Sequence, residues 1–243
     1  MADGVDRRHL AIRQLSTAIP SMQAIVVQSF IAAPAPVVWA ALRERTDILF
    51  DGLPAEAWPE GEEQPPYHLT APWPFTASPK PTIAAVNGVA VGAGVEFATQ
   101  CDFRVAAESA RFGWVFVHRG LVPDQGVASW LLERIVGLQN AAYLLLSGTM
   151  IDAARAKDLG FVLDVVPDAE LMERSLALAA EVSRGGPMAM AETKRLLYRG
   201  SGSDVRSHME RHIQAIERVF ASDDFREGVR AFLDRRPPDW TGH

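Results

Sequence analysis

Residues 81–102 read PTIAAVNGVAVGAGVEFATQCD, and this stretch governs the architecture of the chain. The apolar run 82–86 predicts a short buried strand, the glycines that follow predict a tight turn, and 95–100 predicts a short helix. Glycine lets the backbone approach a ligand closely, and a helix N-terminus offers N–H groups with a partial positive charge. The stretch therefore predicts a strand–turn–helix unit that can hold a phosphate or an oxygen that becomes negative during a reaction.

Strand and helix patterns alternate downstream of this unit. The predicted elements are a strand at 103–107, a helical stretch at 129–146 broken at Gly137, a helix at 153–159 stopped by Gly160, and a buried strand at 161–166. This alternation predicts an α/β fold for the middle of the chain.

Every pattern beyond residue 166 is helical. Asp168 suits the N-cap of a helix, and Pro187 and Gly200 bracket another helix in the expected order. A stripe of apolar residues at helical spacing follows, formed by Val205, Met209, Ile213, Ile216 and Phe220, and Phe225, Val229 and Phe232 repeat it.

The N-terminal part differs in composition, with a long charge-free run and many prolines. Ala24–Phe30 predicts a strand, and prolines within the charge-free run 15–42 argue against a membrane span. Residues 51–79 are rich in proline, which predicts a long surface loop of the kind that forms lids or shapes a pocket. The aromatic residues Trp58, Tyr67 and Trp73 of this loop either shape such a pocket or cover the core.

Composition excludes several classes of protein. The chain has 243 residues, of which 48% are hydrophobic and 22% charged, as in ordinary globular proteins. Its single cysteine, Cys101, excludes an internal disulfide framework and a zinc site of several thiolates. The formal net charge of −6 argues against general nucleic-acid binding. We expect a cytoplasmic protein that binds neither nucleic acid nor membrane.

Two carboxylates stand out as candidates for chemistry. Glu96 lies in the first turn of the predicted helix, where it either complements the helix dipole or faces whatever the N–H groups hold. Asp124, between Pro123 and Gln125-Gly126, is either a turn residue or a carboxylate aimed into a site from a loop.

Other motifs are weak. Gly92-x-Gly94 begins a dinucleotide-binding pattern, but Phe97 occupies the position of the third glycine. His208 and His212 have the i, i+4 spacing of metal ligands without an obvious third ligand, so we expect no metal site. A glycine-rich nucleotide-binding protein therefore remains only a remote alternative.

Taken together, these segments resemble the crotonase superfamily of enoyl-CoA hydratases and isomerases. The resemblance covers about residues 80–243: the stretch 81–102, then 112–137 and 147–166, and finally SDDFREG at 222–228 with AFL at 231–233 and RRP at 235–237. It implies a fold of stacked ββα turns, a superhelix over residues 1–185, of which 1–50 are atypical. It also implies a C-terminal helical region, 186–243, that mediates assembly into a homotrimer or a hexamer of two trimers.

The resemblance also implies a function. The substrate would be an acyl-CoA thioester whose oxygen is held by two backbone N–H groups as it becomes an enolate, one supplied at Ala93 with Gly94 beside it. Glu96 matches an acid/base glutamate of the hydratases, and Asp124 matches the acid/base position of the isomerases. Coenzyme A is part of the substrate and no separate cofactor is expected. Phe232 and Arg235 lie where the C-terminal helix of such proteins approaches a bound coenzyme A.

The sequence departs from the family pattern at two places. Phe116 stands at the position of the second hydratase glutamate and cannot transfer a proton, although Glu96 and Asp124 together offer a replacement pair. Upstream, Ala33-Pro34-Ala35-Pro36 replaces the usual glycine loop, and proline has no N–H to serve as the first oxyanion donor. Whether residues 30–50 supply that donor is left open.

These observations lead to a main hypothesis with alternatives. We expect an enzyme of fatty-acid or related acyl-CoA metabolism that hydrates an enoyl-CoA or moves its double bond. The alternatives are a non-catalytic acyl-CoA-binding homologue and an epoxide-type or ring isomerase of aromatic acyl-CoA degradation.

Overall fold

The computed structural model describes residues 25–29, 73–123, 126–200 and 202–243. A parallel sheet with the order β1-β2-β4-β7 forms its centre. These strands are Ile25–Ser29, Thr82–Val86, Phe103–Ala107 and Asp164–Val166. A smaller sheet has the order β3-β5-β6, with strands Val89–Val91, Arg111–Gly113 and Ile151–Asp152. The strands expected at 82–86 and 103–107 are confirmed, and β1 lies within the strand expected at Ala24–Phe30.

The central sheet separates two apolar clusters because successive side chains of a strand point to opposite faces. Ala84 and Val86 of β2 join the larger cluster, whereas Ile83 and Ala85 join the smaller one against helix α8, Leu171–Val182. With both faces covered, β2 is buried along its whole length and apolar from Ile83 to Val86, as strands of parallel sheets usually are.

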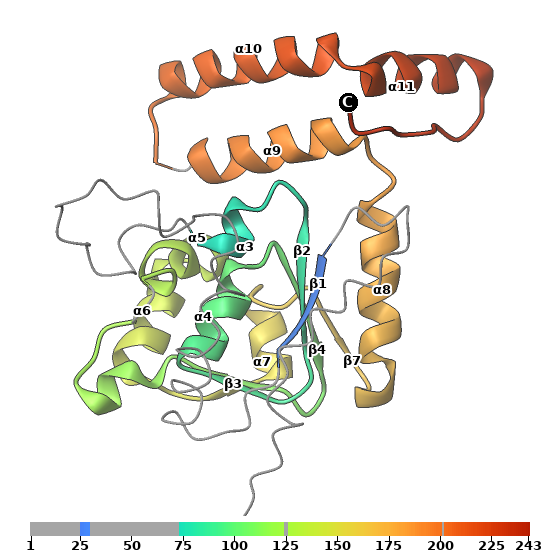
Figure 1. Ribbon diagram of the computed structural model, residues 1–243. Coiled ribbons are helices and arrows are strands. Elements are labelled where there is room, and N and C mark those ends of the chain that lie inside the picture. Colours follow the sequence, from blue (N-terminus) through green and yellow to red (C-terminus); the bar gives the residue numbers. More distant parts are fainter. Residues whose placement is uncertain (1–24, 30–72, 124–125, 201) are drawn as a thin grey trace, which may run out of the picture.

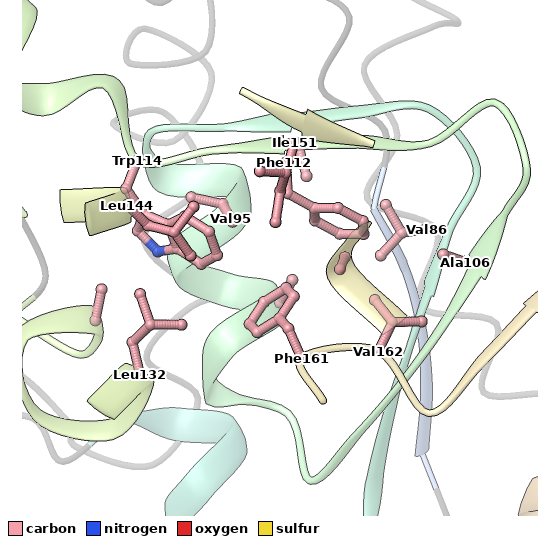
Figure 2. Packing of buried hydrophobic residues seen from close by; sticks show 14 of the residues in the cluster. Val86, Val95, Ala106, Phe112, Trp114, Leu132, Leu144, Ile151, Phe161 and Val162 are labelled. Carbon is pink, nitrogen blue, oxygen red and sulfur yellow. The ribbon is translucent and has the colours of Figure 1, made fainter. Parts of the chain in front are cut away.

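The larger cluster fills the space between the sheet and the helices around α4, Ala93–Gln100. Phe112, Trp114 and Phe161 are fully buried and meet edge to face, with ring centroids 5.4 Å and 5.0 Å from Phe161. Figure 2 shows these rings pointing toward one another, beside Val95 of α4. This packing fixes α4 against the small sheet.

Short helices complete this half of the molecule. They are α3 (Pro74–Ala77), the 3₁₀ helix η4 (Val115–Arg119), the π-helical turn η5 (Ala128–Leu132), α5 (Glu133–Val136), α6 (Leu138–Ser147) and α7 (Ala153–Asp158). The break predicted at Gly137 is confirmed, since this residue separates α5 from α6 with φ at +80°. Gly160 ends α7 as expected, with φ at +77°.

Two local predictions are wrong. The strand expected at 161–166 is reduced to Asp164–Val166, because the Phe161 carbonyl accepts a hydrogen bond from the Arg104 side chain and does not face a neighbouring strand. Asp168 does not cap the following helix. Its carboxylate instead accepts hydrogen bonds from the hydroxyl and then the backbone N–H of Ser109, which lower the pKa of Asp168. Residues 168–170 form the 3₁₀ turn η6 before α8.

The C-terminal helices lie above the sheet layer in Figure 1, with α9 (Pro187–Gly200) nearest to it and α10 (Val205–Ala221) and α11 (Asp223–Asp234) beyond. The predicted bounds of α9 are confirmed. The apolar stripe of α10 is present and largely exposed, with Val205 78% and Phe220 59% exposed, although the Phe220 ring contacts that of Phe225 in α11. Within the described residues, no helix combines the length and the apolar character that crossing a membrane requires.

Candidate active site

The turn into α4 is built on Gly92. This residue caps the helix with φ +55° and ψ −126°, a backbone conformation that side chains disfavour, and its N–H donates to the Gly113 carbonyl over 3.3 Å. The bond ties the turn to strand β5 and so fixes where the helix begins. The predicted strand–turn–helix unit is therefore confirmed, with the helix starting two residues earlier than expected, at Ala93.

Ala93 and Gly94 are the first two residues of α4. The first N–H groups of an α-helix have no carbonyl partner within the helix, and the first intrahelical bond here joins the Glu96 N–H to the Gly92 carbonyl. Ala93 is half-buried and Gly94 is buried. The structure thus places Ala93 and Gly94 in the first turn of α4, where the helix dipole favours negative charge, and their role as oxyanion donors stays a prediction.

Glu96 lies one turn into α4 and is fully buried. Its Oε2 accepts hydrogen bonds from the backbone N–H groups of Val127, at 3.1 Å, and Ala128, at 3.4 Å. These amides open the π-helical turn η5, so the carboxylate caps a second helix in addition to lying near the start of its own. The interpretation that Glu96 only complements the dipole of α4 is therefore incomplete, and no sequence pattern signals its contact with Val127 and Ala128.

Phe116 is in η4 and only 6% exposed, within the larger apolar cluster. Its side chain contributes packing and no proton-transfer group where the family pattern has a glutamate. Asp124 lies outside the described residues, as do Pro34, Pro36 and residues 51–72 of the loop predicted at 51–79, with the aromatic residues Trp58 and Tyr67.

Phe232 and Arg235 are at the end of α11. Phe232 is 82% exposed, and Arg235 forms the left-handed C-cap with φ +54°. In the view of Figure 1, α9 lies between α4 and the pair α10 and α11. The structure of one chain therefore does not bring these two residues together with Glu96.

A buried ionic cluster lies at the opposite end of α4. The carboxylate of Asp102 accepts hydrogen bonds from Lys194 Nζ at 2.7 Å, from the Thr82 N–H at 2.7 Å and hydroxyl at 2.9 Å, and from the Tyr198 hydroxyl at 2.8 Å. Burial, followed by the charge of Asp102, raises the pKa of Tyr198. Sequence reasoning missed this cluster because its members are distant in the sequence, with Asp102 and Tyr198 alone 96 residues apart.

Cys101 and Arg104 border this cluster. Burial raises the pKa of the Cys101 thiol to about 12, so the thiol is protonated and inert at neutral pH. Burial also lowers the pKa of the Arg104 guanidinium, whose partners are backbone carbonyls. These groups surround the base of α4 and not its N-terminal face.

Among the described residues, the histidine pair of α10 has no ligand set around it. His208 and His212 stack with ring centroids 6.2 Å apart. Over the residues that the structure describes, no three or more His, Cys, Asp or Glu side chains come together as a metal site would require.

Comparisons with known proteins agree with this architecture. The family model described as enoyl-CoA hydratase/isomerase matches residues 72–243. The chain is 39% identical to 2,3-dehydroadipyl-CoA hydratase of Escherichia coli, over 67% of this chain and 64% of that protein. It is 37% identical to 1,2-epoxyphenylacetyl-CoA isomerase of the same organism, over 68% of this chain and 62% of that protein.

A solved structure extends the likeness to most of the chain. The enoyl-CoA hydratase of Bacillus anthracis superposes with a TM-score of 0.73 at 25% identity, covering 91% of this chain and 96% of that one. The chain spans slightly less than two thirds of the length of the two Escherichia coli relatives. From the family match and the shared fold together, the chain belongs to the enoyl-CoA hydratase/isomerase family of the crotonase superfamily.

Proposed function

We propose that this protein is an enoyl-CoA hydratase or isomerase that acts on an acyl-CoA thioester through an enolate. The observation that carries the proposal is the start of α4, where the amides of Ala93 and Gly94 precede the buried carboxylate of Glu96 by less than one helical turn. A preorganised amide donor stabilises a developing oxyanion by about 2.7–4 kcal/mol. Amide donors and a carboxylate on one short helix are the parts that enolate chemistry requires.

The chemistry at this site has two possible outcomes. In hydration, a carboxylate takes a proton from water, the oxygen adds to C3 of a 2-enoyl thioester, and the resulting enolate is protonated at C2. In isomerisation, a carboxylate removes a proton from C2 of a 3-enoyl thioester and a proton is returned at C4. Each general acid or base contributes about 10²–10⁴-fold. Phe116 in place of a second glutamate favours isomerisation, or a pair made by Glu96 and Asp124.

Two other functions have support from particular observations. Identity of 37% to an epoxyphenylacetyl-CoA isomerase favours a ring or epoxide-type isomerase of aromatic acyl-CoA degradation. A homologue that binds acyl-CoA without turnover is favoured by two observations. Phe116 lies among apolar side chains and cannot transfer a proton, and the Glu96 carboxylate already accepts hydrogen bonds from two backbone amides.

The proposal includes an assembly. The stripe on α10 and the apolar face of α11 expose Met209, Ile213, Phe225, Val229 and Phe232. A group of exposed apolar residues on neighbouring helices differs from single scattered apolar residues, and it supports contact with further copies of the chain. We propose a homotrimer, or a hexamer of two trimers, formed through residues 186–243, with Phe232 and Arg235 near coenzyme A bound mainly by a neighbouring subunit. Size-exclusion chromatography with light scattering tests this part.

The proposal also covers location and cofactors. We propose a cytoplasmic enzyme of fatty-acid or related acyl-CoA metabolism, and the proton transfers described need no cofactor beyond the substrate itself.

Two variants separate these functions. Glu96→Gln and Asp124→Asn are assayed separately on 2-enoyl-CoA and 3-enoyl-CoA, with product formation followed by chromatography. Loss of hydration in Glu96→Gln together with loss of isomerisation in Asp124→Asn assigns one outcome to each carboxylate. Full activity of both variants on both substrates removes these residues from the mechanism. Tight acyl-CoA binding by the wild type without any turnover establishes the binding homologue instead.

A further inference from the structure

The C-terminal end of α4 is held by side chains from two other segments. The Arg104 guanidinium, from β4, donates Nη1 to the carbonyl of Ala98 at 3.1 Å and to that of Cys101 at 2.6 Å. The Thr76 hydroxyl, from α3, donates to the carbonyl of Gln100 at 3.0 Å. The last carbonyl groups of an α-helix have no partner within the helix, and here those of Ala98, Gln100 and the C-cap Cys101 accept hydrogen bonds from side chains outside it.

Arg104 is fixed in the interior and cannot follow a moving helix. It is 7% exposed, its Nε donates to the Phe161 carbonyl, and its guanidinium carbon lies 5.0 Å from the centre of the Phe161 ring. A buried cation is costly unless it is paired, and the partial negative charge at a helix C-terminus is a suitable partner. The charge therefore binds the helix end to the core beneath it.

The position of Thr76 is fixed in turn by hydrogen bonds from Lys194 of α9. Lys194 Nζ donates to the carbonyl groups of Phe75, at 2.7 Å, and Lys80, at 3.0 Å, on either side of Thr76 in the sequence. The ring of Phe75 packs edge to face on Phe97 of α4, with centroids 6.1 Å apart. Segment 75–80 therefore has a fixed position against α4.

We propose that Arg104 and Thr76 are positioning residues, which set the place of the oxyanion amides by gripping the opposite end of the same helix. This inference rests on the proposed function. Helix α4 has eight residues, so it is only about 12 Å long and moves as one body. A displacement at its C-terminal end is thus transmitted to Ala93, Gly94 and Glu96. A misplacement of about 1 Å can cost about 100-fold in rate.

The chain offers a matched control on the same helix. The buried hydroxyl of Thr99 donates to the Val95 carbonyl at 2.7 Å, wholly within α4. Thr99→Val removes a hydroxyl hydrogen bond from α4 just as Thr76→Val does, but it leaves every tie between α4 and its surroundings in place. Any effect peculiar to Thr76→Val therefore reports on the position of the helix.

The experiment compares Thr76→Val, Arg104→Met, Arg104→Lys and Thr99→Val with the wild type. It measures kcat, KM and the absorption band of a bound aromatic enoyl-CoA analogue, which shifts to longer wavelength when its thioester oxygen accepts hydrogen bonds. We expect kcat to fall about tenfold in Thr76→Val and about 100-fold in Arg104→Met, with KM within about twofold and a reduced band shift. Thr99→Val should retain the wild-type kcat and band shift.

The outcomes separate this inference from the proposed function. Should the wild type shift the band and Thr76→Val shift it equally with unchanged kcat, the inference is wrong while the function stands. A wild type that neither turns over nor shifts the band overturns both. If Arg104→Met fails to fold, Arg104→Lys is the deciding variant, because lysine keeps the positive charge but not the guanidinium geometry that reaches two carbonyl groups of α4. A wild-type kcat and a wild-type band shift in Arg104→Lys would also overturn the inference.

Discussion

Replacement of Lys194 by methionine is the most direct test of what holds the C-terminal helices on the α/β core. The side chain comes from α9 and is only 7% exposed. Its Nζ donates to the carbonyl groups of Phe75 and Lys80 and to the carboxylate of Asp102, at 2.7, 3.0 and 2.7 Å. The variant keeps most of the apolar stem and removes the charge with all three bonds.

The expected loss follows from what remains after the change. Removing one partner of a buried ion pair costs about 3–5 kcal/mol, largely because the other charge is left behind. Asp102 retains hydrogen bonds from the backbone and hydroxyl of Thr82 and from the hydroxyl of Tyr198, all within 2.9 Å. The carboxylate is therefore still partly compensated, and we expect a loss at the lower end, about 3 kcal/mol.

Urea unfolding of the full chain, followed by circular dichroism, measures this free energy. Arg199→Met, at an exposed position of the same helix, is the control and should change stability by less than about 0.5 kcal/mol. The double variant Lys194→Met/Asp102→Asn should lose less than the sum of the two single losses, because the pair is coupled. A loss below about 1 kcal/mol in Lys194→Met would refute the view that this ion pair anchors α9.

Three further outcomes are expected. Because burial raises the pKa of Cys101 to about 12, a thiol reagent at pH 8 should label the native protein far more slowly than the protein in denaturant, and equal rates would contradict that burial. Hydrogen bonds from the Arg236 side chain and the Asp239 backbone lower the pKa of Glu227 to about 2 from 4.5. The stabilisation that Glu227 confers is therefore complete above about pH 4.5 and is lost as the pH falls toward 2. The fluorescence of Trp240, which lies beside Gly228, should change over that range in the wild type but not in Glu227→Gln. Phe161→Ala, which empties the centre of the aromatic cluster, should reduce the free energy of unfolding by about 3–5 kcal/mol in urea titrations, and a loss under about 1.5 kcal/mol would indicate that the cluster collapses around the gap.

Local signals predicted much of the fold. The strand 82–86, the strand 103–107 and helix 187–200 have the bounds that apolar runs and the Pro–Gly bracket indicated. Gly137 and Gly160 mark helix ends because both adopt positive φ angles that other residues avoid. In each case the cause lies within a few residues of its effect, which is where sequence patterns carry information.

The parts that could not be predicted depend on distant partners. The sequence pattern predicts that Asp168 caps a helix, yet its carboxylate accepts hydrogen bonds from Ser109, which is 59 residues away. The π-helical start of η5 and its contact with Glu96 join segments more than 30 residues apart. For the site, the sequence predicted the start of α4 and singled out Ala93, Gly94 and Glu96, whose catalytic roles stay predictions, but it contained no sign of the side chains that hold the base of α4.

The hydrogen bonds between the Glu96 carboxylate and the start of η5 limit how this protein can be re-engineered. One oxygen serves the opening amides of η5, so the connection that leads into η5 and the acidic residue of α4 form a matched pair. A loop transplanted here from a relative would have to deliver its own N–H groups to the same oxygen. Exchanging loops and acidic residues together, as one cassette, is therefore the sound way to recombine specificities on this scaffold.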